Sequence, residues 1–291
     1  AVMPDGRLIT TSKRVKKTAA GYDLTRLLIG SEGTLGVITE LTLKLYGVPQ
    51  AISGGVCPFP SVDSACRTVI ETIQMGIPVA RIELVNALQM QAMIQYAQLD
   101  YPPTPCLFVE FHGSDAGVAE QAELFGEIAA ANGSGEFRWA TRAEDRNRLW
   151  KARHEAYFSA LTLRPGARPL ATDVCVPISR LAECVTDTER DIGETGLVAP
   201  IVGHVGDGNF HVQILIDVEN PAEIAAAEGF VERLNRRALE MEGTCTGEHG
   251  IGQGKMRFLE QELGPAVDFM RAVKNAIDPL GIMNPGKVFV T

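Results

Sequence analysis

Apolar residues recur along the chain with two spacings: every three to four residues, which predicts a helix, and every second residue, which predicts a strand. Helical spacing predicts long helices at residues 61–76, 116–133, 144–161, 179–196 and 220–243. The last has the clearest ends, with Asn220 at the N-cap, Pro221 at the first helical position and Gly243 beyond the final turn. Apolar residues at every second position predict a strand at 37–47, and an apolar run predicts another at 106–113.

The ends of the chain give shorter signals. Residues 1–11 resemble a hairpin with its turn at 4–7, and residues 22–30 predict a short helix capped by Asp23. The segment after residue 245 is expected to contain one further helix. Strands and amphipathic helices alternate over residues 50–245, so this region is expected to form an α+β domain of its own.

Composition narrows the class of protein. The 291 residues are 45% hydrophobic and 22% charged, as in globular domains, and the net charge of −9 argues against a nucleic-acid partner. An anionic substrate would therefore need local positive charge, from an arginine or a metal. The sequence has no apolar run of about 18 residues, which predicts no transmembrane segment.

The cysteines and the start of the chain suggest a cellular setting and a truncation. The six cysteines form no C-x-x-C pair, which predicts reduced thiols inside the cell. We therefore expect a cytoplasmic protein, with peripheral attachment at the inner membrane or the mitochondrial matrix as alternatives. Because residue 1 is already inside a structural pattern, the chain is expected to be a fragment.

The stretch GHVGDGNFH, residues 203–211, contains two of the five histidines. If Asp207 and Gly208 form a two-residue hairpin turn, His204 lies directly opposite His211. Opposed side chains on one face of a sheet have Cβ atoms about 4.5–5.5 Å apart. The two imidazoles could then share a metal ion, although ordinary sheet histidines remain the alternative.

A second glycine-rich stretch, TGEHGIGQGK at residues 246–255, contains adjacent acidic and basic candidates. Glu248 would supply a third ligand, and two histidines with one carboxylate and an open position make a catalytic metal site. Because adjacent side chains diverge, His249 could instead face the substrate as a general base.

Two further motifs carry weaker signals. Arg153 lies on a predicted helix, where its guanidinium suits a substrate carboxylate, or where it pairs with Glu155 or an aspartate on the surface. GSEGTLG, residues 30–36, could wrap a phosphate or a flavin with its backbone N–H groups. It is neither a dinucleotide-binding fingerprint nor a P-loop.

Six motifs together resemble one family. GYDLTRLLIGSEGTLGVIT, WKARHE, ATDVCVP, GHVGDGNFH, TGEHGIGQGK and NPGKVF stand here in the order found in FAD-linked oxidases of the vanillyl-alcohol oxidase type. The most similar subgroup contains D-lactate dehydrogenase, D-2-hydroxyglutarate dehydrogenase and the glycolate oxidase FAD subunit. The resemblance covers essentially the whole chain.

This resemblance implies an α+β fold in which a cap domain is inserted into a flavin domain. Residues 1–49 would be the end of a PCMH-type FAD-binding domain, of which only this remnant is present. Residues 50–245 would form the inserted α/β cap with an antiparallel sheet, which binds substrate. Residues 246–291 would return to the flavin.

The resemblance also implies roles for single residues. The positions of His204, His211 and Glu248 match ligands of a divalent ion, zinc or manganese. His249 matches the base, Arg153 matches the residue that grips the substrate carboxylate, and Asn209 lies beside the substrate. The flavin side comprises Gly30, Ser31, Glu32, Gly33, Thr34, Gly36, Val37, Ile38 and Asn284.

The implied reaction is the metal-assisted oxidation of a short D-2-hydroxy monocarboxylate to the 2-oxo acid, with hydride transfer to FAD. D-lactate is favoured, because Ala171 lies where the 2-hydroxyglutarate enzymes carry a lysine for a second carboxylate. The electron acceptor is left open among a cytochrome, a quinone, an electron-transfer flavoprotein and a partner Fe–S subunit. A glycolate oxidase FAD subunit, a non-catalytic binding module and a metal hydrolase are the competing interpretations.

Overall fold

The computed structural model describes residues 1–140 and 142–289 of the chain, which divide into two compact units. The sheet unit comprises Val48–Gly247, and the terminal unit combines Ala1–Gly47 with Glu248–Thr291. The two units are described separately below.

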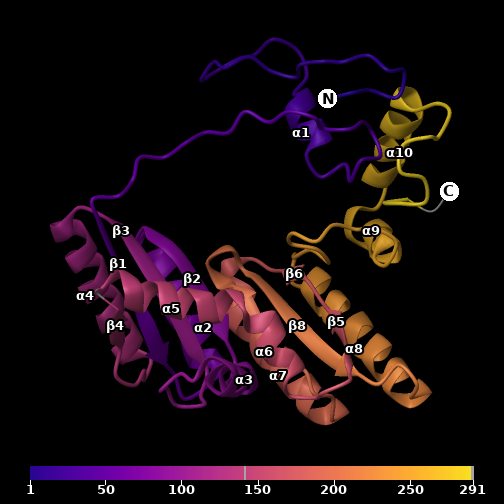
Figure 1. The fold of residues 1–291 in the computed structure, drawn as a ribbon. Helices are drawn as coiled ribbons and strands as arrows, with labels where there is room; N and C mark the ends of the chain where they lie inside the picture. Colours follow the sequence, from indigo (N-terminus) through magenta and orange to yellow (C-terminus); the bar gives the residue numbers. More distant parts are fainter. Residues whose placement is uncertain (141, 290–291) are drawn as a thin grey trace. The chain divides into compact units, whose positions relative to one another are not determined.

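The sheet unit is built on one antiparallel sheet (Figure 1). The strand order along its main path is β4-β1-β3-β2-β7-β8-β5, and β6 also pairs with β8. Every strand pair in the described residues is antiparallel. The strands are β1 (Ala51–Pro58), β2 (Val79–Val85), β3 (Cys106–Gly113), β4 (Arg138–Ala140), β5 (Arg168–Ala171), β6 (Val174–Cys175), β7 (Ile201–His204) and β8 (Asn209–Ile216).

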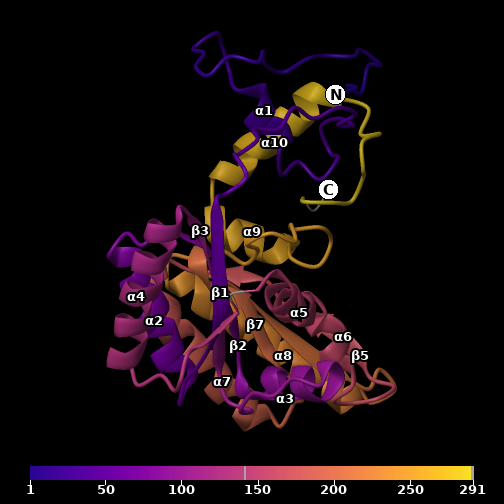
Figure 2. The same cartoon turned by 60° about the vertical axis from the view of Figure 1, so that its left-hand side comes forward.

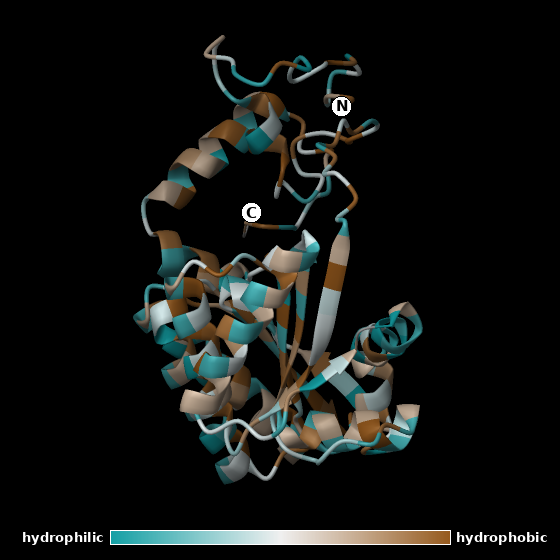
Figure 3. Ribbon diagram, turned by 90° about the vertical axis from the view of Figure 1, so that its left-hand side faces the viewer, coloured by the Kyte–Doolittle hydropathy of each residue, from teal (hydrophilic) through white to brown (hydrophobic). Residues whose placement is uncertain are grey.

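Helices cover both faces of this sheet, which Figure 2 shows with β1 seen between them. One face carries α2 (Val62–Gln74), α4 (Asp115–Ala131), α7 (Leu181–Thr195) and α8 (Pro221–Glu240), over a large apolar core. The other face carries α3 (Ala87–Ala97), α5 (Ala143–His154) and α6 (Ala156–Leu161), over a smaller core. Figure 3 shows the apolar colouring concentrated along the strands, as expected of a sheet buried on both sides.

The long helices begin where the sequence predicts. Ser61 accepts a hydrogen bond from the backbone of Ser64 at the start of α2, and Ser114 accepts one from Gly117 at the start of α4. Asn220 caps α8 in the same way, with Pro221 as its first residue. Each such cap is worth about 1 kcal/mol, because it satisfies an N–H group that the helix itself leaves unpaired.

Two predicted elements are wrong in part. The helix predicted over 144–161 is broken at Glu155 into α5 and α6. The strand predicted at 37–47 is not formed in the described residues: only Val37 makes a bridge, to Val2, and Leu43 and Leu45 are exposed. A strand needs a partner for its backbone groups, and alternation alone does not supply one.

The predicted hairpin exists, but its register is wrong. β7 and β8 are joined through the 3-10 turn η2 (Val205–Asp207) and Gly208, so His204 pairs with Asn209 and His211 pairs with Val202. The predicted pairing differs from this register by two residues, and a shift of two leaves every side chain on its original face. The two histidines are therefore diagonal neighbours on one face.

The terminal unit contains little regular structure. Its helices are α1 (Leu24–Leu28), α9 (Met256–Leu263) and α10 (Ala266–Ile277), so two helices follow residue 245 where one was predicted. Asp23 caps α1, and the predicted hairpin at the start of the chain closes through a bridge between Val2 and Leu8. Among the described residues of either unit, no helix combines the length and apolar character needed to span a membrane.

Candidate functional site

A row of polar side chains crosses the sheet on the face that carries α3, α5 and α6. Because strand side chains alternate between faces, Ile82 and Leu84 of β2 enter the large core, while Arg81 and Glu83 point to the opposite face. The row continues on the neighbouring strands with Glu110 and His112 of β3, His204 of β7, and Asn209 and His211 of β8.

The predicted histidine pair lies near the centre of this row. The ring centroids of His204 and His211 are 5.6 Å apart, with ring planes at 81°. The Nδ1 atom of His204 lies 2.9 Å from Oε1 of Glu83, and Nδ1 of His211 lies 3.1 Å from the carbonyl oxygen of Thr172. A carbonyl and a carboxylate only accept hydrogen bonds, so each Nδ1 is the donor, and in the neutral imidazole the lone pair that can bind a metal is then on Nε2.

This donor set fits a divalent transition metal. Histidines that bind metals through one ring nitrogen almost always donate the other N–H to a carboxylate or a backbone carbonyl, which fixes the tautomer and the ring direction. Both kinds of outer partner are present here, Glu83 for His204 and Thr172 for His211.

Arg153 of α5 reaches the same row from above the sheet. Its Nη2 donates to Oε2 of Glu83 at 2.7 Å, and both side chains are about nine-tenths buried. Glu83 was not among the partners considered from the sequence, which were Glu155 and an aspartate. Sequence reasoning missed Glu83. The available signal was the pair of charges at alternate positions of VARIELV, on the face opposite Ile82 and Leu84.

Asn209 is held tightly beside the histidines. Its Nδ2 donates to Oδ1 of Asp173 at 2.8 Å and to the carbonyl of Val174 at 2.9 Å. Thr246 Oγ1 donates to the other oxygen of Asp173. A Cβ atom at Gly247 would lie 2.1 Å from the Asn209 amide, so only glycine fits there. The Oδ1 atom of Asn209 is a buried acceptor with no partner within the described part of the chain.

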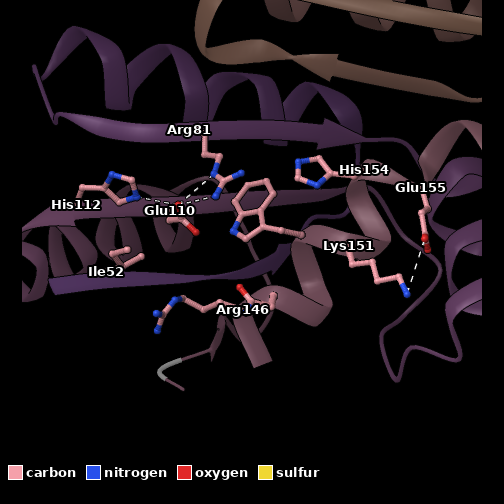
Figure 4. Close-up of a pocket in the computed structure, with 10 residues that line it drawn as sticks. Ile52, Arg81, Glu110, His112, Arg146, Lys151, His154 and Glu155 are labelled. Carbon is pink, nitrogen blue, oxygen red and sulfur yellow. Dashed lines mark hydrogen bonds and ion pairs between the residues drawn. The ribbon is translucent and has the colours of Figure 1, made fainter. Parts of the chain in front are cut away.

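A separate pocket of about 530 Å³ lies farther along the same row (Figure 4). Arg81 stacks on Trp150, 3.8 Å from the ring centroid, and donates to Glu110, as does His112. Burial alone would raise the pKa of Glu110, but the hydrogen bonds from Arg81 and His112 outweigh it and hold that pKa below its usual value. None of the residues predicted from the sequence to form the site lines this pocket.

In the terminal unit, three glycine-rich segments that are distant in sequence are tied together by Glu32. Its carboxylate accepts from the backbone N–H groups of Ile251 at 2.7 Å and Gly252 at 2.8 Å, and its carbonyl accepts from Nδ2 of Asn284. A Cβ atom at Gly250 would lie 2.8 Å from that carboxylate, and the residue has φ +85°. Glycine is therefore required both by the close packing and by the backbone conformation.

The loop that follows α1 contains backbone donors that have no acceptor in the described residues. Thr34 bonds back to Ser31 through its N–H and its hydroxyl, and Val37 bonds to Val2. Across residues 1–140 and 142–289, no hydrogen-bond acceptor is found for the backbone N–H groups of Glu32, Gly33, Gly36 and Ile38. A run of such donors suits a phosphate or the acceptor edge of a flavin.

The other two predicted residues, Glu248 and His249, open the second segment of the terminal unit, whereas the histidine pair belongs to the sheet unit. Oε1 of Glu248 lies 3.8 Å from Nε2 of His249, and both side chains are about half exposed.

The six cysteines form no disulfide in the described residues, and Cys175 lies beside the site as the strand partner of Asn209. Burial raises the pKa of the Cys57 thiol to about 11 and that of Cys106 to about 12, so both stay protonated near neutral pH.

Comparison with known proteins gives a consistent result. A family described as "FAD linked oxidases, C-terminal domain" matches residues 48–288. A Danio rerio protein named "Probable D-lactate dehydrogenase, mitochondrial" is 49% identical over 99% of this chain and 59% of its own length. The "D-lactate dehydrogenase [cytochrome], mitochondrial" of Arabidopsis thaliana is 42% identical over 99% of this chain and 51% of its own length.

The chain thus spans little more than half the length of these two relatives. Among solved structures, 4-ethylphenol oxidase from Gulosibacter chungangensis is similar with a TM-score of 0.75 and 17% identity, over 99% of this chain and 64% of that one. At this identity the likeness concerns the fold alone. It agrees with the predicted α+β class and the vanillyl-alcohol oxidase type.

Proposed function

This chain belongs to the FAD-linked oxidases, and on that premise we propose that the whole protein oxidises a short D-2-hydroxy acid to the 2-oxo acid, with D-lactate as the favoured substrate. The observation that carries the proposal is the histidine pair, whose Nδ1 atoms are both held by outer acceptors beside a buried arginine. The names of the two relatives, at 49% and 42% identity, support D-lactate.

The first element of the proposal is a metal site. His204, His211 and Glu248 are the proposed ligands, and zinc or manganese is the proposed ion. Two imidazoles and one carboxylate would leave a coordination position open for substrate.

The second element is the flavin. We assign residues 1–49 to the end of an FAD-binding domain, 50–245 to the substrate-binding cap, and 246–291 to a segment that packs on the flavin side. The unpaired N–H groups of the loop after α1 support a role in holding FAD. The proposed cofactor contacts are Gly30, Ser31, Glu32, Gly33, Thr34, Gly36, Val37, Ile38 and Asn284.

The residues of the chain then take distinct roles. Arg153 binds the substrate carboxylate, and the buried Oδ1 of Asn209 faces the substrate as an acceptor. His249 takes the proton of the 2-hydroxyl as general base. When bound, the metal would supply Lewis acidity at the hydroxyl and FAD would supply the hydride acceptor.

The electrons must then leave the flavin. A cytochrome, a quinone, an electron-transfer flavoprotein and an Fe–S subunit are all chemically competent acceptors. The name of the Arabidopsis relative favours the cytochrome, and both names favour mitochondria if the source is eukaryotic. The second candidate is a glycolate oxidase FAD subunit, since Ala171 favours any substrate with a single carboxylate.

Anaerobic flavin reduction in the whole protein tests this function. D-lactate, L-lactate and glycolate would each be mixed with the FAD-loaded protein while the loss of flavin absorbance is followed. Fastest reduction by D-lactate is expected. Faster reduction by glycolate would favour the oxidase subunit, and no reduction by any 2-hydroxy acid would favour a non-catalytic module.

A further inference from the structure

Glu83 touches both kinds of group required by the proposed function. Its Oε1 lies 2.9 Å from Nδ1 of His204, and its Oε2 accepts from Nη2 of Arg153 at 2.7 Å. The three groups come from β2, β7 and α5, which are far apart in sequence. Both partners therefore share one buried carboxylate.

The register of the sheet sets this contact. β2 pairs with β7 so that Leu84 opposes Gly203, and the next position along places Glu83 opposite His204. Because the pair faces away from the large core, the carboxylate is buried under α5, where Arg153 is the cation that offsets its charge. Packing and register together leave Glu83 little freedom to turn away.

We propose that Glu83 is a positioning residue that sets the direction of the metal ligand and of the substrate arginine at once. By accepting the Nδ1 proton of His204, it keeps the tautomer whose Nε2 binds a metal. By holding Nη2 of Arg153, it fixes the guanidinium at a set distance from that metal ligand. This inference rests on the proposed function and adds to it a residue that the sequence motifs did not include.

A second carboxylate on the same face provides a matched control. Glu110 is also buried, and it also bonds an arginine and a histidine, Arg81 and His112. However, both of these partners converge on Oε1 of Glu110, whereas Glu83 uses one oxygen for each partner. A purely structural role predicts that the two carboxylates behave alike.

The test compares Glu83→Gln with Glu110→Gln in the 291-residue chain. Affinity for zinc and for manganese would be measured by competition with a chelator, and the His204 tautomer by long-range ¹⁵N correlation spectra of the imidazole. An amide has only one acceptor oxygen, so Glu83→Gln should lower metal affinity by about 10–100-fold and move His204 toward the Nε2–H tautomer. Glu110→Gln should change neither.

Three results would overturn the proposal. These are unchanged metal affinity in a folded Glu83→Gln chain, an equal loss in both variants, and an Nε2–H tautomer of His204 in the unaltered chain. The last measurement needs no variant, so it decides the matter even if Glu83→Gln fails to fold. If the unaltered chain binds no metal, the proposed metal function fails. The positioning role of Glu83 is then decided by the His204 tautomer alone: a shift in Glu83→Gln supports it, and an unshifted tautomer refutes it.

Discussion

At the scale of single residues, the acceptor that a histidine binds through Nδ1 decides whether its Nε2 can act as a metal ligand. His204 and His211 are chemically the same group, and each is oriented by a different acceptor, a carboxylate for one and a backbone carbonyl for the other. Both contacts leave Nε2 as the ligand atom. A metal site depends on this agreement as much as on the presence of two histidines.

His211→Ala should abolish metal binding, because one imidazole and one carboxylate cannot hold a zinc or manganese ion firmly. About one ion per chain is expected before the change and almost none after it, as measured by elemental analysis of the dialysed protein. The control is His112→Ala, which removes a histidine from the same face outside the pair. Equal metal content in the two variants would contradict the assigned ligands.

Arg153→Ala should raise the KM for the hydroxy acid in the whole protein by about 10–100-fold, since a charged hydrogen bond contributes about 1.5–3 kcal/mol. The rate constant kcat should change less than KM, because the carboxylate is held in both the ground and the transition state. Steady-state kinetics check this.

Arg81→Ala is the matched control, because Arg81 also pairs with a buried glutamate on this face. It should destabilise the fold without altering KM. If Arg153→Ala also left KM unchanged, the arginine would be part of the structure alone.

At the scale of elements, the hairpin that carries the histidines depends on the loop between its strands. Gly208 has φ +80°, and a Cβ atom there would lie 2.1 Å from the carbonyl oxygen of Val176. The loop therefore needs glycine both for its backbone conformation and for its close packing. The register follows from this loop, and the common face of the histidines follows from the register.

Gly208→Ala should destabilise the protein by more than about 2 kcal/mol, because the strain of a left-handed residue, about 1–2 kcal/mol, adds to a steric clash. Gly166→Ala is the control: Gly166 also has a positive φ, +85°, but a Cβ atom there would meet open space. Gly166→Ala should lower the free energy of unfolding only by the strain of the left-handed backbone, about 1–2 kcal/mol. Urea unfolding of both variants separates the two effects, and equal losses would show that Val176 moves aside.

Charge pairing between α7 and α8 gives the fold a dependence on pH. Burial alone would raise the pKa of Asp191, but hydrogen bonds from Arg233 and Arg237 outweigh it and lower that pKa below the usual 3.8. A lowered pKa in the folded state means that the stabilisation is present above pH 3.8 and is lost as the pH falls through the folded-state value.

Asp191→Asn should therefore be less stable than the unaltered chain at pH 6, and the difference should shrink as the pH falls below about 4. Urea unfolding at several pH values would measure this. Asp217→Asn is a suitable control, because within the described part of the chain the carboxylate of Asp217 accepts one local backbone hydrogen bond, from Glu219. A difference that stayed constant with pH would show that the Asp191 carboxylate is not coupled to folding through its charge.

At the scale of the whole molecule, both apolar cores lie inside the sheet unit. The described residues of the terminal unit bury few apolar side chains and leave many exposed, among them Tyr22, Leu45, Phe269 and Leu280. Hydrophobic burial is the main favourable term in folding. The two units should therefore differ greatly in their ability to fold alone.

A chain of residues 48–247 should unfold cooperatively in urea, with a midpoint close to that of the sheet unit in the 291-residue chain. Limited proteolysis of the full chain should cut first within residues 38–47, which form no helix or strand. Circular dichroism and mass spectrometry check the two results. A non-cooperative transition in the excised unit would mean that the terminal segments complete its core.

The sequence by itself determined the features that depend on neighbours along the chain. Helix starts at Ser61, Ser114 and Asn220 were predictable, because a cap bonds to residues two or three positions ahead. The order of the six motifs was also sufficient to recognise the family. Face alternation put both histidines on one side of the sheet even though the predicted register was wrong.

Only the tertiary structure decided the features that depend on distant partners. The strand expected at 37–47 had the right pattern, but beyond Val37 no strand partner for it is found among residues 1–140 and 142–289. The helix over 144–161 broke at Glu155 into α5 and α6. Arg153 and His204 both bind Glu83, which lies 70 and 121 positions away from them in sequence. Such contacts are set by strand register and packing, which no local pattern encodes.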